Sequence, residues 1–214
     1  MTSLTTTQGI VIALCLYFGI GYINEFTAEN TIWRSIDRKP LYDRIHAIVP
    51  PIPAMWPNLG LISLIAYFLL GWCWSDPKVL ENYLWLVALL FVGRVLTFSV
   101  TQVPPPKSGC STVEKGHHMR WIPFANGWHE CEDQMYSGHT IHAVLIALFV
   151  LHLSKSVPEK VVVVIAVITE LFLVIAGRLH YSADVSVAIL VTVLAFLAWP
   201  GVDVIFDYLR KRLV

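Results

Sequence analysis

The chain has 214 residues, of which 56% are hydrophobic and only 14% are charged, and its mean hydropathy is +0.64. A soluble domain carries about 25% charged residues. The composition therefore excludes an ordinary soluble protein and favours an integral membrane protein. The formal net charge is zero, which gives no reason to expect binding to nucleic acid.

Six apolar runs approach the roughly 20 residues that cross about 30 Å of hydrocarbon. They predict membrane helices over residues 9–26, 55–74, 80–100, 139–153, 161–176 and 182–199. The N-terminal stretch has no basic region and no clear small-residue cleavage site, so we interpret the first run as a retained helix rather than a cleaved signal. The sequence thus predicts an all-α fold, a single six-helix membrane domain over residues 1–214.

Two connections, residues 27–54 and 101–138, are long and rich in polar residues, proline and tryptophan. With six spans, both connections and the turn "GRLHY" (177–181) fall on one face of the membrane, and the termini fall on the other. Basic residues occur on both faces, so their distribution does not decide the orientation. An active site at a membrane surface requires that separate polar segments share a face in this way.

The segment "GRLHYSADV" (177–185) contains His180 and Asp184 at a spacing of four, which places them on one face of a helix. The carboxylate can fix the imidazole tautomer and leave the other ring nitrogen free as a nucleophile or base. In the alternative interpretation, Asp184 caps a helix beside an interfacial histidine. A charged group entering a membrane helix costs about 2.5–3.5 kcal/mol, which favours a functional role.

The segment "YSGHT" (136–140) combines a tight Ser137–Gly138 turn with the start of a helix, an arrangement that binds anions. His139 then lies near any anion bound there. In the alternative interpretation, Ser137 is only an N-cap and His139 an interfacial polar residue. We expect a structural or supporting role for His142 and an interfacial position for His152.

Together, two histidines and an aspartate at helix ends on one face match the requirements of phosphoryl transfer through a phosphohistidine. One histidine attacks phosphorus, the aspartate holds it, and the other histidine transfers the proton of the leaving or attacking oxygen. Basic side chains stabilise the phosphoryl oxygens. This chemistry needs no metal and no cofactor.

These motifs resemble those of the sphingomyelin synthase family, a branch of the PAP2-like lipid phosphatase superfamily. "SGHT" and "HYSADV" are similar to its two core motifs, and "CEDQMYSGHT", "GRVLTFSVTQVPPPKSGC" and "RKPLYDRIHAIVP" to further family segments. The similar segments lie in the family's order between residues 38 and 190, with Glu132 replacing a glycine and Tyr42 a proline. The resemblance implies a PAP2-like bundle that transfers phosphocholine, or a related headgroup, from phosphatidylcholine to a lipid alcohol such as ceramide.

The resemblance also implies residue roles. His180 becomes the nucleophile, Asp184 orients it, and His139 protonates the leaving diacylglycerol and later deprotonates the acceptor hydroxyl. Substrate contacts are expected from phosphate-binding arginines, from carboxylates that attract a cationic headgroup, and from the residues before His139. These substrate-binding candidates are Arg94, Arg178, Asp43, Asp133, Tyr136 and Ser137.

Several alternatives remain open. The acceptor could be diacylglycerol, as in a phosphatidylcholine:diacylglycerol cholinephosphotransferase, or the headgroup could be inositol or ethanolamine phosphate. A hydrolase of the phosphatase or phospholipase C type would use water, although the Lys-x6-Arg-Pro motif of lipid phosphatases is absent. A membrane scaffold with a relic site is the non-enzymatic alternative.

The remaining expectations concern the surroundings of the enzyme. Cys110 and Cys131 share one loop and could form a disulfide if that loop faces an oxidising compartment. The resemblance implies an active site on the lumenal or extracellular face of the Golgi, endoplasmic reticulum or plasma membrane, with cytosolic termini. The expected partners are membrane lipids, and the chain could form a homo-oligomer.

Overall fold

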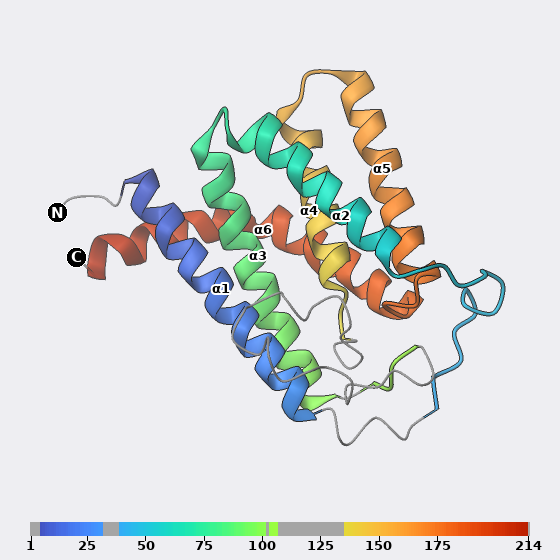
Figure 1. Cartoon of the computed structure of the whole chain (residues 1–214). Coiled ribbons are helices and arrows are strands. Elements are labelled where there is room, and N and C mark those ends of the chain that lie inside the picture. The colour runs from blue at the N-terminus through green and yellow to red at the C-terminus, as the bar shows by residue number, and fades with distance from the viewer. Residues whose placement is uncertain (1–4, 32–38, 102, 107–134, 214) are drawn as a thin grey trace.

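Every regular element in the described part of the chain is a helix (Figure 1). The computed structural model describes residues 5–31, 39–101, 103–106 and 135–213. The elements are α1 (Thr6–Thr31), α2 (Met55–Phe68) with a π-helical turn (Leu69–Cys73), α3 (Pro77–Val100), α4 (Gly138–Leu153), α5 (Val157–Ala176) and α6 (Ser182–Leu213). Each of the six predicted runs corresponds to one helix, which confirms the all-α fold.

Four of these helices have the length and apolar composition of a membrane span, namely Thr6–Asn24, Met55–Cys73, Pro77–Val100 and Ser182–Pro200. Helix α4 has 16 residues, a length of about 24 Å at 1.5 Å per residue. Helix α5 carries the charged residues Glu159, Lys160 and Glu170. The protein is therefore an integral membrane protein, and the prediction of six spans is confirmed for four.

The helix starts follow from short-range capping. Asp76 accepts a hydrogen bond from the backbone of Lys78 at the start of α3, and Pro77 occupies the first helical position. Ser156 caps α5 in the same way, again with a proline in the first turn. Such caps satisfy backbone N–H groups that have no partner within the helix.

Helix α4 is the centre of the bundle. Helices α2, α3, α5 and α6 all contact α4, whereas α1 packs along α3. The side chains of Ile141, Leu145, Ile146 and Val150 on α4 are fully buried. Outer helices expose apolar side chains such as Val162 and Ile168, as expected of surfaces that face lipid.

The polar connections gather at one end of the bundle. The backbone N–H of Ile52, before α2, donates to the carbonyl of Ala176 at the end of α5. Arg94, near the end of α3, donates to the carbonyl of Tyr136, just before α4. The described parts of both long connections therefore share an end with the turn before α6. Which compartment this end faces remains a prediction.

Candidate functional site

The start of α4 is built around Ser137. Its side chain is fully buried, and its hydroxyl oxygen accepts a hydrogen bond of 3.2 Å from the backbone N–H of Thr140, which is a standard N-cap. Gly138 is the first helical residue, and a Cβ atom there would lie 3.6 Å from the guanidinium carbon of Arg94. Arg94 thus lies near the positive end of α4, where anions bind.

His139 lies in the first turn of α4 and contacts α2. Its Nε2 atom is 2.8 Å from the Oδ1 atom of Asn58. The ionisable side chains that act on it electrostatically are His180, His142 and Arg94. His139 and His180, which are 41 positions apart in the sequence, are therefore neighbours in the fold.

His180 and Asp184 form the second part of the site, and both are buried. The Nδ1 atom of His180 is 3.8 Å from the Oδ2 atom of Asp184, which is too long for a hydrogen bond. The same Oδ2 atom accepts a hydrogen bond of 3.1 Å from the backbone N–H of Tyr181, the residue before α6. Asp184 therefore caps α6, as the alternative interpretation of the sequence held, while it faces the imidazole.

One backbone hydrogen bond joins the two parts. The N–H of Ser137 donates to the carbonyl oxygen of Asp184 at 3.4 Å. The first turns of α4 and α6 are thus in contact, and the predicted catalytic residues His139, His180 and Asp184 lie at the same end of the bundle. Such a cluster places a proton-transferring imidazole near a second, potentially nucleophilic one.

Asp43 lies behind the site and holds the first long connection against α6. One carboxylate oxygen accepts hydrogen bonds from the backbones of Ile45 and His46, and the other accepts them from the backbone and hydroxyl of Ser182. Burial acts to raise the pKa of Asp43, but these hydrogen bonds outweigh it and lower the pKa to about 2. The carboxylate is fully engaged within the protein, and its predicted contact with a cationic headgroup stays a prediction.

Arg178 links the same connection to the end of α5. Its guanidinium donates to the carbonyls of His46 and Val49 at 2.8 and 2.7 Å. Its backbone has a φ of 56°, in the left-handed region that favours glycine. Neighbouring backbone bonds, from Arg178 to Ile175 and from Leu179 to Val174, complete a Schellman motif. An arginine in this glycine position indicates that its side chain is needed there.

The pKa of His46, whose carbonyl accepts from Arg178, is affected by burial and by the positive charge of that arginine. Burial lowers the pKa of its imidazole, and the charge of Arg178 lowers it further. The ring lies 5.7 Å from that of Tyr181. The neutral form of His46 is therefore favoured.

Arg94 and Tyr136 fasten the start of α4 to α3 and α1. The guanidinium donates to the carbonyl of Tyr136 at 2.6 Å and to the side-chain oxygen of Asn24 at 2.8 Å. The hydroxyl of Tyr136 donates to the carbonyl of Leu90, and its ring end fits against Gly93. Both side chains are buried, and their predicted roles in substrate binding, like that of Ser137, stay predictions.

The two other histidines of α4 differ in their surroundings. His142 is buried, with Nδ1 2.7 Å from the hydroxyl of Tyr83 and Nε2 3.4 Å from that of Tyr17. These contacts join α4 to α3 and α1, as expected of a structural histidine. His152 is exposed at the far end of the helix and contacts the ring of Phe196.

The remaining predicted residues lie outside the described part of the chain. These are Asp133 and the cysteines Cys110 and Cys131, so the predicted headgroup contact and the disulfide stay predictions. No group of three or more metal-ligating side chains occurs among the residues that the structure describes.

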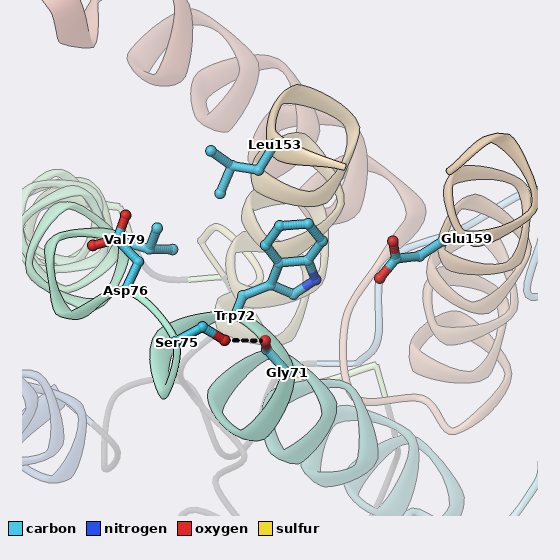
Figure 2. A pocket seen from close by; sticks show the side chains of 7 residues that line it. All are labelled: Gly71, Trp72, Ser75, Asp76, Val79, Leu153 and Glu159. Carbon is cyan, nitrogen blue, oxygen red and sulfur yellow. Dashed lines mark hydrogen bonds between the residues drawn. The ribbon is translucent and has the colours of Figure 1, made fainter. Parts of the chain in front are cut away.

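A cavity of about 310 Å³ lies at the opposite end of the bundle, where α4 ends (Figure 2). It is lined by Gly71, Trp72, Ser75, Asp76, Val79, Leu153 and Glu159. Its α4 residue, Leu153, is 14 positions beyond His139, about 21 Å along the helix. The cavity is therefore separate from the histidine cluster.

Two residues near the cluster were not singled out in the sequence. Asn58, which faces His139, belongs to an apolar run and has no motif around it. Tyr181 lies inside the "HYSADV" motif, and its hydroxyl accepts from the backbone of Leu41 and donates to the carbonyl of Pro104. Its position in the sequence between His180 and Asp184 could have marked Tyr181 as a residue near the site.

The chain is similar to known membrane-lipid enzymes. Residues 130–200 match the family model described as the PAP2 superfamily C-terminal domain. The chain is 26% identical over 70% of its length to a phosphatidylethanolamine:ceramide ethanolaminephosphotransferase of Trypanosoma brucei brucei, of which it covers 50%. It is 30% identical over 69% of its length to phosphatidylinositol:ceramide inositolphosphotransferase 2 of Arabidopsis thaliana, of which it covers 45%.

A human relative extends this similarity. The chain is 29% identical over 74% of its length to sphingomyelin synthase-related protein 1 of Homo sapiens, of which it covers 43%. The chain thus spans about half the length of the curated relatives it matches. The family match includes both histidine segments, in agreement with the resemblance seen in the motifs. Residues 130–200 thus match the PAP2 superfamily, and the chain is similar to ceramide phosphotransferases and to a sphingomyelin synthase-related protein.

Proposed function

We propose that the protein is a lipid phosphotransferase that moves a phospho-headgroup from a glycerophospholipid to ceramide. The observation that carries the proposal is the convergence of His139, His180 and Asp184, whose helix starts are joined by the hydrogen bond from Ser137 to Asp184. The names of the relatives support ceramide as the acceptor, since two of them are ceramide phosphotransferases. Phosphocholine, from phosphatidylcholine, is the headgroup that we propose first.

The reaction proceeds in two displacements. In the first, the Nε2 atom of His180 attacks phosphorus, the bond to the diacylglycerol oxygen breaks, and His139 donates a proton to that oxygen. In the second, the ceramide hydroxyl attacks the phosphohistidine, its proton passes to His139, and the nitrogen–phosphorus bond breaks. Each step leaves the two imidazoles ready for the next, as expected of covalent catalysis with a shared acid and base.

Asp184 orients the nucleophile in this scheme. Its Oδ2 atom needs to approach Nδ1 of His180 by about 1 Å to form a hydrogen bond. Catalytic hydrogen bonds are often long without substrate and shorten in the complex. A carboxylate on Nδ1 keeps the proton there, leaves Nε2 free for phosphorus, and stabilises the positive charge of the phosphorylated ring.

The direct test uses the purified protein in vesicles. Phosphatidylcholine, phosphatidylethanolamine and phosphatidylinositol are offered as separate labelled donors, each with ceramide, with diacylglycerol, or with no acceptor. We expect label to move to ceramide. Label that moves to diacylglycerol but not to ceramide identifies the cholinephosphotransferase alternative, and release of free headgroup phosphate without transfer to ceramide identifies a hydrolase. Either result would refute ceramide transfer.

The phosphohistidine is tested in the same preparation. With donor alone, the wild-type protein should acquire an acid-labile label, and His180→Asn should acquire none. His152→Ala is the matched control, because this histidine is exposed at the opposite end of α4 and should not affect labelling. A label that persists in His180→Asn would contradict the assigned nucleophile.

A further inference from the structure

Asn58 is the side chain that meets the proposed acid–base histidine directly. It lies in the first turn of α2, is 8% exposed, and places its Oδ1 atom 2.8 Å from Nε2 of His139. A buried amide in an apolar helix requires a hydrogen-bond partner, and here its partner is the imidazole.

The first turn of α2 is fixed between both parts of the site. Pro57, adjacent to Asn58, lies against Gly177, where an added Cβ atom would be 3.1 Å from the proline ring. Gly177 is three residues before His180. Asn58 is therefore held relative to the turn that carries one histidine while it contacts the other.

The hydrogen bond determines which nitrogen of His139 carries the proton. A neutral imidazole has one N–H group and one lone pair. With the Oδ1 atom of Asn58 facing Nε2, the hydrogen bond favours the tautomer that carries its proton on Nε2 and its lone pair on Nδ1. The nitrogen that exchanges protons with a lipid oxygen is then Nδ1.

We propose that Asn58 is a positioning residue that holds His139 in the tautomer with Nδ1 available for proton transfer. This inference rests on the proposed function. His180 has the opposite arrangement, because Asp184 faces its Nδ1 and leaves Nε2 for phosphorus. The two histidines thus use different ring nitrogens, each selected by a different partner.

A neutral partner suits a group that must act as both acid and base. The ionisable side chains that act on His139 are His180, His142 and Arg94, while the described parts of α5 and α6 contribute the buried carboxylates of Glu170 and Asp184. Of these carboxylates, Asp184 is engaged with Tyr181, and Glu170 lies against Gly60. An amide orients the ring without favouring the imidazolium, whereas a carboxylate would favour it.

Three variants test the proposal. Asn58→Ala removes the hydrogen-bond acceptor, and Asn58→Asp keeps an acceptor but adds a negative charge. Asn82→Ala is the control, because Asn82 lies near the start of α3, at the end of the bundle away from His139 and His180. Transfer is measured in vesicles from pH 5 to pH 9, with kcat and KM determined separately. A ¹⁵N spectrum of the histidine side chains, assigned with His139→Gln, reports the tautomer without any need for activity.

We expect Asn58→Ala to lower kcat about tenfold to a hundredfold, since misplacement of a catalytic group by about 1 Å has this effect, with little change in KM. Asn58→Asp should retain more activity and move the acid limb of the kcat profile to higher pH by about 1–3 units, as a new neighbouring charge does. Asn82→Ala should match the wild type in kcat and in the pH profile of kcat.

The inference is wrong if Asn58→Asp has the wild-type profile, or if Asn58→Ala changes neither kcat nor the His139 tautomer. These outcomes differ from a failure of the proposed function, in which the wild-type protein itself transfers no headgroup. In that case the ¹⁵N spectra still decide whether Asn58 fixes the tautomer.

Discussion

The carboxylate of Asp43 should stabilise the fold by joining the connection before α2 to the start of α6. Asp43→Asn leaves a single oxygen for four donors, so at least one pair of hydrogen bonds is lost and the amide N–H₂ faces another donor. The negative charge at the positive end of α6 is lost as well. We therefore expect this single-atom change to lower the free energy of unfolding.

The magnitude follows from the pKa of this group. A fall from 3.8 to about 2, at about 1.4 kcal/mol per pKa unit, corresponds to about 2 kcal/mol. Because the pKa is lower in the folded protein, this contribution is fully present above about pH 4. It decreases as the carboxylate becomes protonated and is lost below about pH 2. The difference in stability between wild type and Asp43→Asn should be constant from pH 5 to pH 8.

Thermal unfolding in detergent, followed by tryptophan fluorescence, measures this difference. Asp76→Asn is the control, because Asp76 caps α3 with one hydrogen bond at the opposite end and asparagine is an equally good cap. Equal unfolding temperatures for Asp43→Asn and wild type, together with selective loss of transfer from donors whose headgroup carries a cationic amine, would refute the structural role. That result would support the predicted contact between Asp43 and the headgroup.

Three further predictions follow. His180→Ala and Asp184→Asn should each lower transfer in vesicles by at least about 100-fold, and near-normal activity in either would contradict its assigned role. Arg178→Gly should be more stable in thermal unfolding than Arg178→Ala by about 1 kcal/mol, because glycine adopts the left-handed φ of 56° without strain; equal stability would exclude strain there. Gly60→Ala should lower the unfolding temperature only slightly, because its Cβ atom would overlap the carboxylate of Glu170, the end of a flexible side chain that has to shift. Adding Glu170→Ala should restore stability, and a purely additive double variant would rule out this contact.

The sequence predicted the helices well because each apolar run is long and interrupted by polar connections. Most helix starts agree within three residues, and the differences lie at ends where periodicity carries little information. Helix α6, for example, continues through Pro200 to Leu213 instead of ending near residue 199. Membrane helices tolerate an internal proline because neighbouring groups compensate for the lost backbone hydrogen bond.

The sequence singled out His139, His180 and Asp184 as candidates from their places near helix starts, and the structure brings them to one end of the bundle, while their catalytic roles stay predictions. The sequence could not assign the partners that these residues meet in the fold. Asn58 is 81 residues from His139, and no local pattern marks an amide as the acceptor for a distant imidazole. Likewise, Asp43 and Arg178 have the charges expected of substrate contacts, but Asp43 accepts a hydrogen bond from the backbone of Ser182 and Arg178 donates to the carbonyls of His46 and Val49.

The hydroxyl of Tyr181 connects three parts of the chain that are far apart in sequence, since it joins Leu41 and Pro104 to the turn that carries His180. Small displacements of either connection should therefore be transmitted through this hydroxyl, among other links, to His180, the proposed nucleophile. Lipid that pushes against these connections from the membrane would then alter the reactivity of a histidine that it does not touch. Hydrogen exchange at the amide of Leu41, measured with and without phospholipid, offers a direct view of this mechanical coupling.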